Sequence, residues 1–150
     1  VVVQRLQPAA NVEGNDMHHL LSKIYRLAAN EPISHQGKVP HYLYAYELIP
    51  LIDDPDYKTY VGETGKSVEE RYSEHADGSR ACLIVRKGHY LVGPLRRDVI
   101  DSLPTFKCRE CAEIAEGLLA DYFDDVEGGA YSNNGSAAEL RREEMESDDA

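Results

Sequence analysis

The stretch TYVGETGKSVEERYSEH, residues 59–75, holds the signals that decide the fold. It opens with aromatic and β-branched residues that favour a strand, and GETGK then supplies a turn. Ser67 begins the pattern S-V-E-E, in which a serine hydroxyl caps a helix and the glutamate three positions later bonds back to it. We therefore expect a strand over 57–62 and a helix over about 68–76.

The residues before this stretch predict a partner strand. The segment HYLYAYELI (41–49) is rich in aromatic and apolar residues that alternate along a strand. Only a short loop separates it from the strand at 57–62, so antiparallel pairing is favoured. The alternation puts two sets of side chains on opposite faces of the sheet: Tyr42, Tyr44, Tyr46 and Leu48 on one face, and Leu43, Ala45 and Glu47 on the other.

The residues after it predict a further strand and a long helix. Segment 81–93 holds two apolar runs split by a basic turn, and either run suits a strand. Residues 107–124 carry one broad apolar face at helical spacing, with Thr105 near the N-cap, and 127–135 is turn and loop material. The sequence thus predicts an α/β (α+β) fold with a short, mainly antiparallel three-stranded sheet flanked by helices.

Composition divides the chain into three parts. Residues 1–40 are expected to hold an amphipathic helix over 15–30, capped by Asn15 or Asp16, and a proline-containing linker. Residues 41–135 form the central domain. Residues 136–150 are an acidic C-terminal tail with at most a short charged helix.

The net charge of −11 bears on the class of partner. A protein that follows a nucleic-acid backbone normally shows a basic surface. The acid is either a solubilising coat or a sign of another partner, and charge alone does not decide, because a basic groove can lie on an acidic protein. Basic residues concentrate between residues 80 and 109, as a solvated loop or as contacts to a substrate backbone, for which we single out Arg86, Lys87, Arg96 and Arg97.

Apolar runs, the N-terminal segment and the cysteines bear on the class of protein and its compartment. No run approaches the ~20 apolar residues that span a bilayer, and no signal-peptide pattern opens the chain, so we expect a cytoplasmic protein without a membrane partner. A zinc site at Cys108-x-x-Cys111 needs four ligands, which only Cys82 and a histidine such as His89 could complete. Inert buried thiols are favoured over zinc, and a zinc-stabilised interaction domain is kept as the third option.

Five features in order carry a family resemblance. Tyr42-Leu43-Tyr44 and Tyr60-Val61-Gly62 lie on the two expected strands, and Arg71 and His75 follow in an E-R-x-x-x-H context. Glu116 stands in the pattern A-x-x-x-E-x-x-L, and Asn133 comes late. Over about 41–135 the chain resembles the GIY-YIG nuclease family, although Tyr42 replaces the family's first glycine.

The resemblance implies a metal-dependent endonuclease that cleaves DNA. The residues it implies as catalytic are Tyr44, Tyr60, Arg71, His75, Glu116 and Asn133. A Mg²⁺ or another divalent cation would be held by Glu116, the planar charged fork of Arg71 would clamp the phosphate, and a tyrosine would activate the water. Glu113 and Asn134 remain alternatives to Glu116 and Asn133. The alternative function is a catalytically inactive module that binds nucleic acid or protein.

Overall fold

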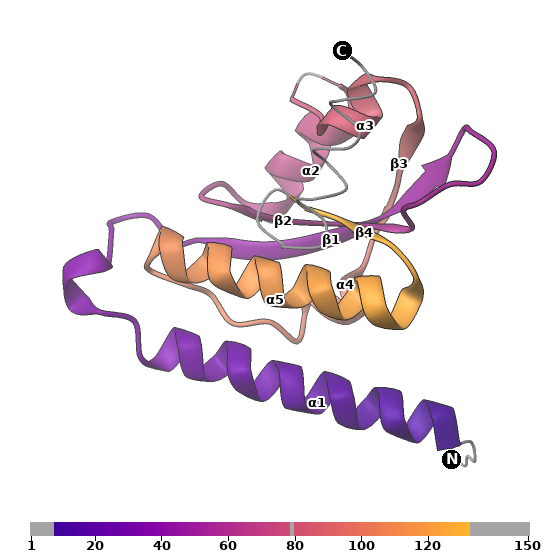
Figure 1. The fold of residues 1–150 in the computed structure, drawn as a ribbon. Helices are drawn as coiled ribbons and strands as arrows, with labels where there is room; N and C mark the ends of the chain where they lie inside the picture. Colours follow the sequence, from indigo (N-terminus) through magenta and orange to yellow (C-terminus); the bar gives the residue numbers. More distant parts are fainter. Residues whose placement is uncertain (1–7, 79, 133–150) are drawn as a thin grey trace.

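Four strands form one sheet in the spatial order β3-β1-β2-β4 (Figure 1). The computed structural model describes residues 8–78 and 80–132, with side chains from Met17 onward. Its strands are β1 (Tyr42–Pro50), β2 (Thr59–Thr64), β3 (Tyr90–Leu95) and β4 (Ala130–Tyr131). Strand β1 pairs antiparallel with β2 and β3, and β2 pairs parallel with β4. The predicted α/β class and mainly antiparallel sheet are therefore confirmed.

The sheet has one strand more than the sequence predicts. Strand β4 lies inside 127–135, which was expected to be loop. It is two residues long and follows Gly128 and Gly129, so it carries no alternation that a pattern could reveal. Within residues 8–78 and 80–132, its pairing is confined to Thr59 and Tyr60 of β2, so none of these residues pairs with the outer side of the rest of β2.

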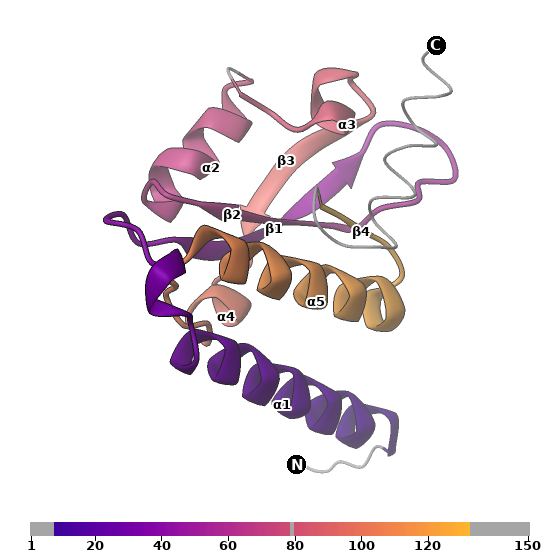
Figure 2. The ribbon, with the colours of Figure 1, turned by 60° about the vertical axis from the view of Figure 1, so that its left-hand side comes forward.

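The two faces of β1 belong to two separate cores, as the alternation predicts. Leu43 and Ala45 pack in one apolar cluster, on the side of the sheet that the long helix covers. Tyr44 and Tyr46 pack in the other, while Glu47 is exposed. Helices α2 (Val68–Ala76) and α3 (Leu83–Arg86) cover this second face in Figures 1 and 2.

Helices α5 (Arg109–Glu127) and α1 (Pro8–Ala29) form two further layers on the first face, with α5 against the sheet and α1 outside it (Figure 2). Helix α1 begins at Pro8, so the prediction of a cap at Asn15 or Asp16 is wrong, and both residues lie inside the helix. Proline suits a first helical turn because its fixed φ is helical and its missing N–H has no partner there. None of the described helices combines the length and apolar character needed to cross a membrane.

Helix α2 begins where the capping box places it. The Ser67 hydroxyl oxygen accepts a hydrogen bond from the Glu70 backbone N–H at 3.1 Å, and the Ser67 hydroxyl donates to the Glu70 carboxylate at 3.3 Å. The predicted bounds of 68–76 are therefore confirmed. The same cap decides which helical face Arg71 and His75 occupy.

The start of α5 differs from the prediction. The N-cap is Cys108 rather than Thr105, and its sulfur accepts a hydrogen bond from the Cys111 backbone N–H at 3.3 Å. Phe106 pairs with His41 in an isolated β-bridge, so the backbone before Cys108 is extended and the helix cannot begin earlier. Segment 81–93 divides into α3 and β3, and short helices η1 (Ile33–His35) and α4 (Arg97–Ile100) lie in the remaining connections.

Candidate functional site

A pocket of about 910 Å³ lies where β2, α2 and α5 meet. Tyr60 of β2, Arg71 of α2 and Glu116 of α5 all line it. These three were singled out from the sequence, and they come from elements on both faces of the sheet. Within the described residues β4 pairs with only two residues of β2, and the pocket lies beside the part of β2 that follows them.

His75 holds two tyrosines on the inner side of α2. Its ring nitrogen Nε2 lies 3.0 Å from the Tyr44 hydroxyl, and Nδ1 lies 2.9 Å from the Tyr46 hydroxyl. Burial, helped by the positive charge of Arg71, lowers the pKa of His75 to about 3. The imidazole is therefore neutral at pH 7, so one nitrogen donates to its tyrosine and the other accepts from it.

Tyr60 connects this buried group to the pocket. Its ring stacks on Tyr46 with centroids 4.9 Å apart and lies 4.9 Å from the ring of His75. Burial raises the pKa of Tyr60 well above its usual value, so the phenol is protonated at neutral pH. The ring of Tyr44 lies 6.0 Å from that of Tyr60 and is fully buried, and burial raises the pKa of Tyr44 too, although Arg71 opposes this.

Gly62 makes room for this arrangement. A Cβ atom at this position would lie 2.7 Å from the Tyr44 hydroxyl oxygen and 2.8 Å from a ring carbon of Tyr60. Carbon atoms do not approach one another so closely. The Tyr-Val-Gly motif therefore needs a glycine at this position, because the rings of Tyr44 and Tyr60 occupy the space that a side chain would fill.

Arg71 is held at the pocket by neighbours on both sides. Its Nη1 donates to the Glu74 carboxylate at 3.1 Å and to the Arg80 carbonyl at 2.9 Å. Glu74 also binds the Lys66 ammonium, so one glutamate positions two cations of the pocket wall. With 23% of its side chain exposed, Arg71 is ordered and still accessible from the pocket.

Glu116 is the buried carboxylate of the pocket. Only 2% of it is exposed, and it accepts a hydrogen bond from the Ser132 hydroxyl just beyond β4. Glu113, one turn earlier, is half-buried, lies 3.4 Å from Arg109 and also lines the pocket. Glu116 is thus the more deeply buried of the two alternative carboxylates.

The four predicted backbone-binding residues lie elsewhere on the described part of the molecule. Arg86 is exposed and donates to the Ala81 carbonyl at 3.1 Å, and Lys87 is the C-cap of α3. Arg97 pairs with Glu69 at 2.7 Å. Arg96 is 2.9 Å from Glu127, lies over the Phe123 ring and lines a separate cavity of about 260 Å³. Asn133 and Asn134, like the acidic tail 136–150, fall outside the described residues.

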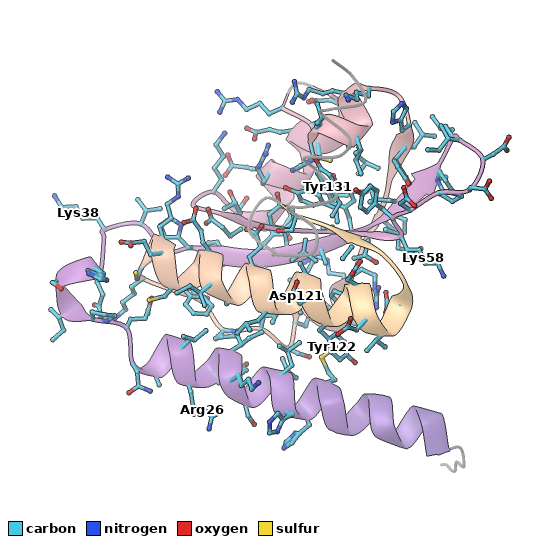
Figure 3. All side chains as sticks on the ribbon, in the orientation of Figure 1. Arg26, Lys38, Lys58, Asp121, Tyr122 and Tyr131 are labelled. Atoms are coloured by element: carbon cyan, nitrogen blue, oxygen red, sulfur yellow. The ribbon has the colours of Figure 1, made fainter. Side chains whose placement is uncertain are left out.

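The pocket gathers basic residues that sequence reasoning did not single out for it. Lys38 comes from the linker, Lys66 from the turn after β2, and Arg80 and Arg109 from the two ends of the basic stretch. Figure 3 shows Lys38 projecting from the linker near the start of α5, whereas Arg26 lies on the outer side of α1. No local signal could group them, because they are brought together only by the fold.

The resulting charge differs from that of the whole chain. Of the side chains that line the pocket, five are basic (Lys38, Lys66, Arg71, Arg80, Arg109) and four are glutamates (Glu63, Glu74, Glu113, Glu116). The chain itself has 16 basic and 27 acidic residues. The side chains that line this pocket therefore do not share the acidic surplus of the whole chain.

Tyr46 is a further residue of the site that the sequence argument missed. Its hydroxyl bonds to His75 and also lies 3.6 Å from the Cys82 sulfur. The alternation of β1, which puts Tyr46 on the same face as Tyr44, was the signal that could have found it. Cys82 thus packs on the face of the sheet opposite Cys108 and Cys111, so the structure does not assemble the four-ligand set expected for a zinc site.

The arrangement suits chemistry on an anion. A permanent cation, a buried carboxylate and a protonated phenol border one pocket, and the phenol is backed by a neutral histidine. Such groups can bind a phosphate, hold a divalent cation and orient a water molecule. No family model, curated protein or solved structure matches the chain.

Proposed function

We propose that this protein is a metal-dependent endonuclease that cleaves phosphodiester bonds in DNA at this pocket. The observation that carries the proposal is the convergence of Tyr60, Arg71 and Glu116 on one concave surface. Their positions along the chain are those that prompted the likeness to the GIY-YIG nuclease family. The convergence supports this likeness, because three separate motifs had no reason to meet if each were only a packing or surface feature.

The basic lining supports an anionic, extended substrate. Lys38, Lys66 and Arg80 are exposed and come from three different segments. A nucleic-acid backbone presents repeated phosphates, and lysine and arginine side chains along a groove bind them without reading sequence. Acidic surface elsewhere restricts the attraction to the pocket.

The pocket has a carboxylate suited to a divalent cation. Glu116 lines the pocket, and a carboxylate oxygen is the type of ligand that a hard divalent cation prefers. Among the described residues, the groups of three or more potential ligands do not include Glu116, so the chain would supply one carboxylate there and water and substrate the rest. Magnesium accepts that arrangement. When bound, such a cation polarises the phosphoryl oxygen and lowers the charge on the leaving oxygen.

The other side chains of the pocket have separate roles in the proposed cleavage. Arg71 binds the phosphate oxygens and stabilises the negative charge that grows on them in the transition state. Tyr60 lines the pocket, and its hydroxyl would orient the attacking water by a hydrogen bond. Tyr44 and His75 are fully buried, so they act through Tyr60 as positioning residues. This assigns Tyr60, rather than Tyr44, to contact with the reacting atoms.

The cysteines are relevant to the compartment. All three are free thiols, and all three are buried. Free thiols persist in reducing surroundings. On this ground we propose a cytoplasmic location.

Nicking of supercoiled plasmid DNA in the presence of Mg²⁺ tests the proposal. We expect Arg71→Ala and Glu116→Gln to lower the cleavage rate by about 10²-fold or more, the usual effect of removing one group that stabilises developing charge. Arg26→Ala on the outer side of α1 is the matched arginine control, and Glu113→Gln tests the competing carboxylate. Both are expected to retain most of the activity.

The outcomes separate cleavage from binding. Equal rates in the wild type, Arg71→Ala and Glu116→Gln would contradict the assigned site. A wild type that shifts DNA in gels but cuts nothing with magnesium or manganese would instead favour the inactive binding module. Circular dichroism of each variant shows whether a lost activity reflects a lost fold.

A further inference from the structure

We propose that Glu31, His35, Cys108 and Cys111 form a zinc site that joins the linker before β1 to the start of α5. The donor atoms of Glu31, Cys108 and Cys111 all lie within 4.8 Å of one another. Those of His35, Cys108 and Glu110 do so as well, and Cys108 belongs to both groups. The site lies outside the nuclease pocket, and the proposal does not depend on the proposed activity.

The two cysteines lie close together at the start of α5. Cys108 is fully buried and is the N-cap of α5, and Cys111, 8% exposed, lies on the first turn of that helix. The Cys108 sulfur already accepts a hydrogen bond from the Cys111 backbone N–H at 3.3 Å. Metal binding would displace the proton from each thiol, because the thiolate is the form that binds zinc.

Glu31 is held in place next to them. One carboxylate oxygen accepts hydrogen bonds from the backbone N–H groups of Lys107, at 2.9 Å, and Cys108, at 2.7 Å. The other oxygen lies 3.1 Å from the Lys107 nitrogen. A carboxylate has about four acceptor positions, so capacity for a metal remains. Glu31 is thereby fixed against the start of α5 although 76 residues of sequence separate it from Lys107.

His35 is the proposed fourth ligand; it shares Cys108 with the first group but is not within 4.8 Å of all three of its donor atoms, so its ring would have to turn toward them. It lies in η1 on the exposed linker, and its ring nitrogen is within 4.8 Å of the Cys108 sulfur. Two sulfurs, one nitrogen and one oxygen make a four-ligand set of the kind that tetrahedral Zn²⁺ accepts. Thiolates select zinc over magnesium or calcium, which prefer oxygen ligands. Glu110, the remaining member of the second group, is an exposed acid that adds negative charge nearby.

The position of the site gives the metal a structural role. Gly37, Lys38 and Val39 of the same linker line the large pocket, and the Gly37 N–H donates to the Lys107 carbonyl at 2.9 Å. Helix α5 carries Glu113 and Glu116 into that pocket. A zinc ion at the start of α5 would therefore fix one rim of the pocket to the helix that supplies its buried carboxylate.

Metal content of the purified full chain tests the proposal. The protein is loaded with zinc, desalted, and analysed for zinc per chain by elemental mass spectrometry. We expect one zinc per chain in the wild type and loss of that zinc in both Cys108→Ser and Cys111→Ser. The matched control is Cys82→Ser, on the opposite face of the sheet, which should keep the metal. For the histidine ligand, His35→Ala should lose zinc during desalting, and the exposed His19→Ala should not.

A cobalt titration of the wild type keeps the test valid if a cysteine variant fails to fold. Cobalt bound to two thiolates in a tetrahedral site gives an intense sulfur-to-metal absorption band, which zinc then abolishes by displacement. The absence of that band, wild-type protein without retained zinc, or equal zinc in wild type and Cys108→Ser would each overturn the proposal. So would a native mass lower by two hydrogens that marks a Cys108–Cys111 disulfide in protein purified without reductant.

Discussion

His75 shows at the scale of one residue how burial changes what a side chain can do. Placed on a surface helix, it would titrate near neutral pH, and its helical spacing from Arg71 would suggest a shared contact with a phosphate. In the fold it is fully buried, and both ring nitrogens are taken by tyrosine hydroxyls. In the structure it fixes the hydroxyls of Tyr44 and Tyr46, and its ring packs against that of Tyr60.

The bond between Tyr46 and His75 predicts a stability effect. Tyr46→Phe leaves Nδ1 of a buried histidine without its hydroxyl partner, and we expect a loss of about 1–3 kcal/mol of unfolding free energy. Tyr25→Phe is the matched control, because the Tyr25 hydroxyl donates to the Ser102 carbonyl at 2.9 Å but the residue is 49% exposed. Urea denaturation should show a clearly larger loss for Tyr46→Phe. Equal losses would mean that burial of the bond has no consequence.

The depressed pKa of His75 predicts a dependence of stability on pH. The folded protein holds His75 neutral down to about pH 3, whereas the unfolded chain binds a proton below about 6.5. The contribution of His75 to the free energy of unfolding is therefore at its maximum above about pH 6.5. It decreases as the pH falls from 6.5 towards 3, by at most about 1.4 kcal/mol per pH unit.

Urea denaturation at a series of pH values measures this slope. His75→Gln should be flatter than the wild type between about pH 6 and pH 4, and the exposed His19→Gln should match the wild type. The groups that face His75 are Tyr44, Tyr46, Tyr60, Arg71 and Glu74; the pKa of Glu74 is lowered by its bond to Lys66. Parallel slopes for the wild type and His75→Gln would show that His75 does not titrate differently in the two states.

At the scale of elements, the site depends on where α2 and β4 begin and end. The Ser67 cap sets the start of α2 and so the helical face on which Arg71 lies. The short β4 leaves the edge of β2 open and then brings Ser132 to Glu116. A longer fourth strand would cover the edge across which α2 and α5 contribute to one pocket.

The prediction for β2 concerns the stability of a variant at Gly62. In Gly62→Ala the new methyl group would enter the space between Tyr44 and Tyr60, and we expect a loss of about 1–3 kcal/mol of unfolding free energy from overpacking. Gly37→Ala is the control, because its nearest contact would be an unstrained 3.9 Å. Chemical denaturation measures both variants. A Gly62→Ala protein as stable as Gly37→Ala would show that the tyrosine rings move aside without cost.

At the scale of the whole molecule, charge is unevenly distributed. The chain carries −11, yet the pocket has one basic side chain more than it has glutamates. This distribution of charge has two electrostatic consequences. Repulsion among the acidic groups opposes the compact state, while the pocket remains able to attract an anion.

The acidic surplus predicts that salt stabilises the fold. The Debye length falls from about 30 Å at 0.01 M to about 3 Å at 1 M salt, which screens the repulsion. We expect the melting temperature at pH 7 to rise with NaCl, by about 2–4 °C for each kcal/mol of repulsion removed. Thermal unfolding followed by circular dichroism measures it. The same series near the isoelectric point of 4.9 is the control, where the rise should vanish. A falling melting temperature at pH 7 would show that ion pairs outweigh repulsion.

The sequence by itself determined the features that depend on near neighbours. The bounds of α2, the alternation of β1 and its pairing with β2 all follow from residues a few positions apart. Helical and strand periods place such side chains on one face whatever the rest of the chain does. The candidate residues Tyr60, Arg71 and Glu116 could be chosen for the same reason.

Only the tertiary structure decided which distant groups meet. The parallel pairing of β4, the cationic wall from Lys38 to Arg109, and the approach of Glu31 and His35 to Cys108 join segments that no local pattern relates. Arg86, Lys87, Arg96 and Arg97 were chosen because they are neighbours in sequence, and the fold turns them to other surfaces. Proximity in a folded chain depends on how layers pack around the core, and that packing is a property of all the contacts together rather than of any one stretch.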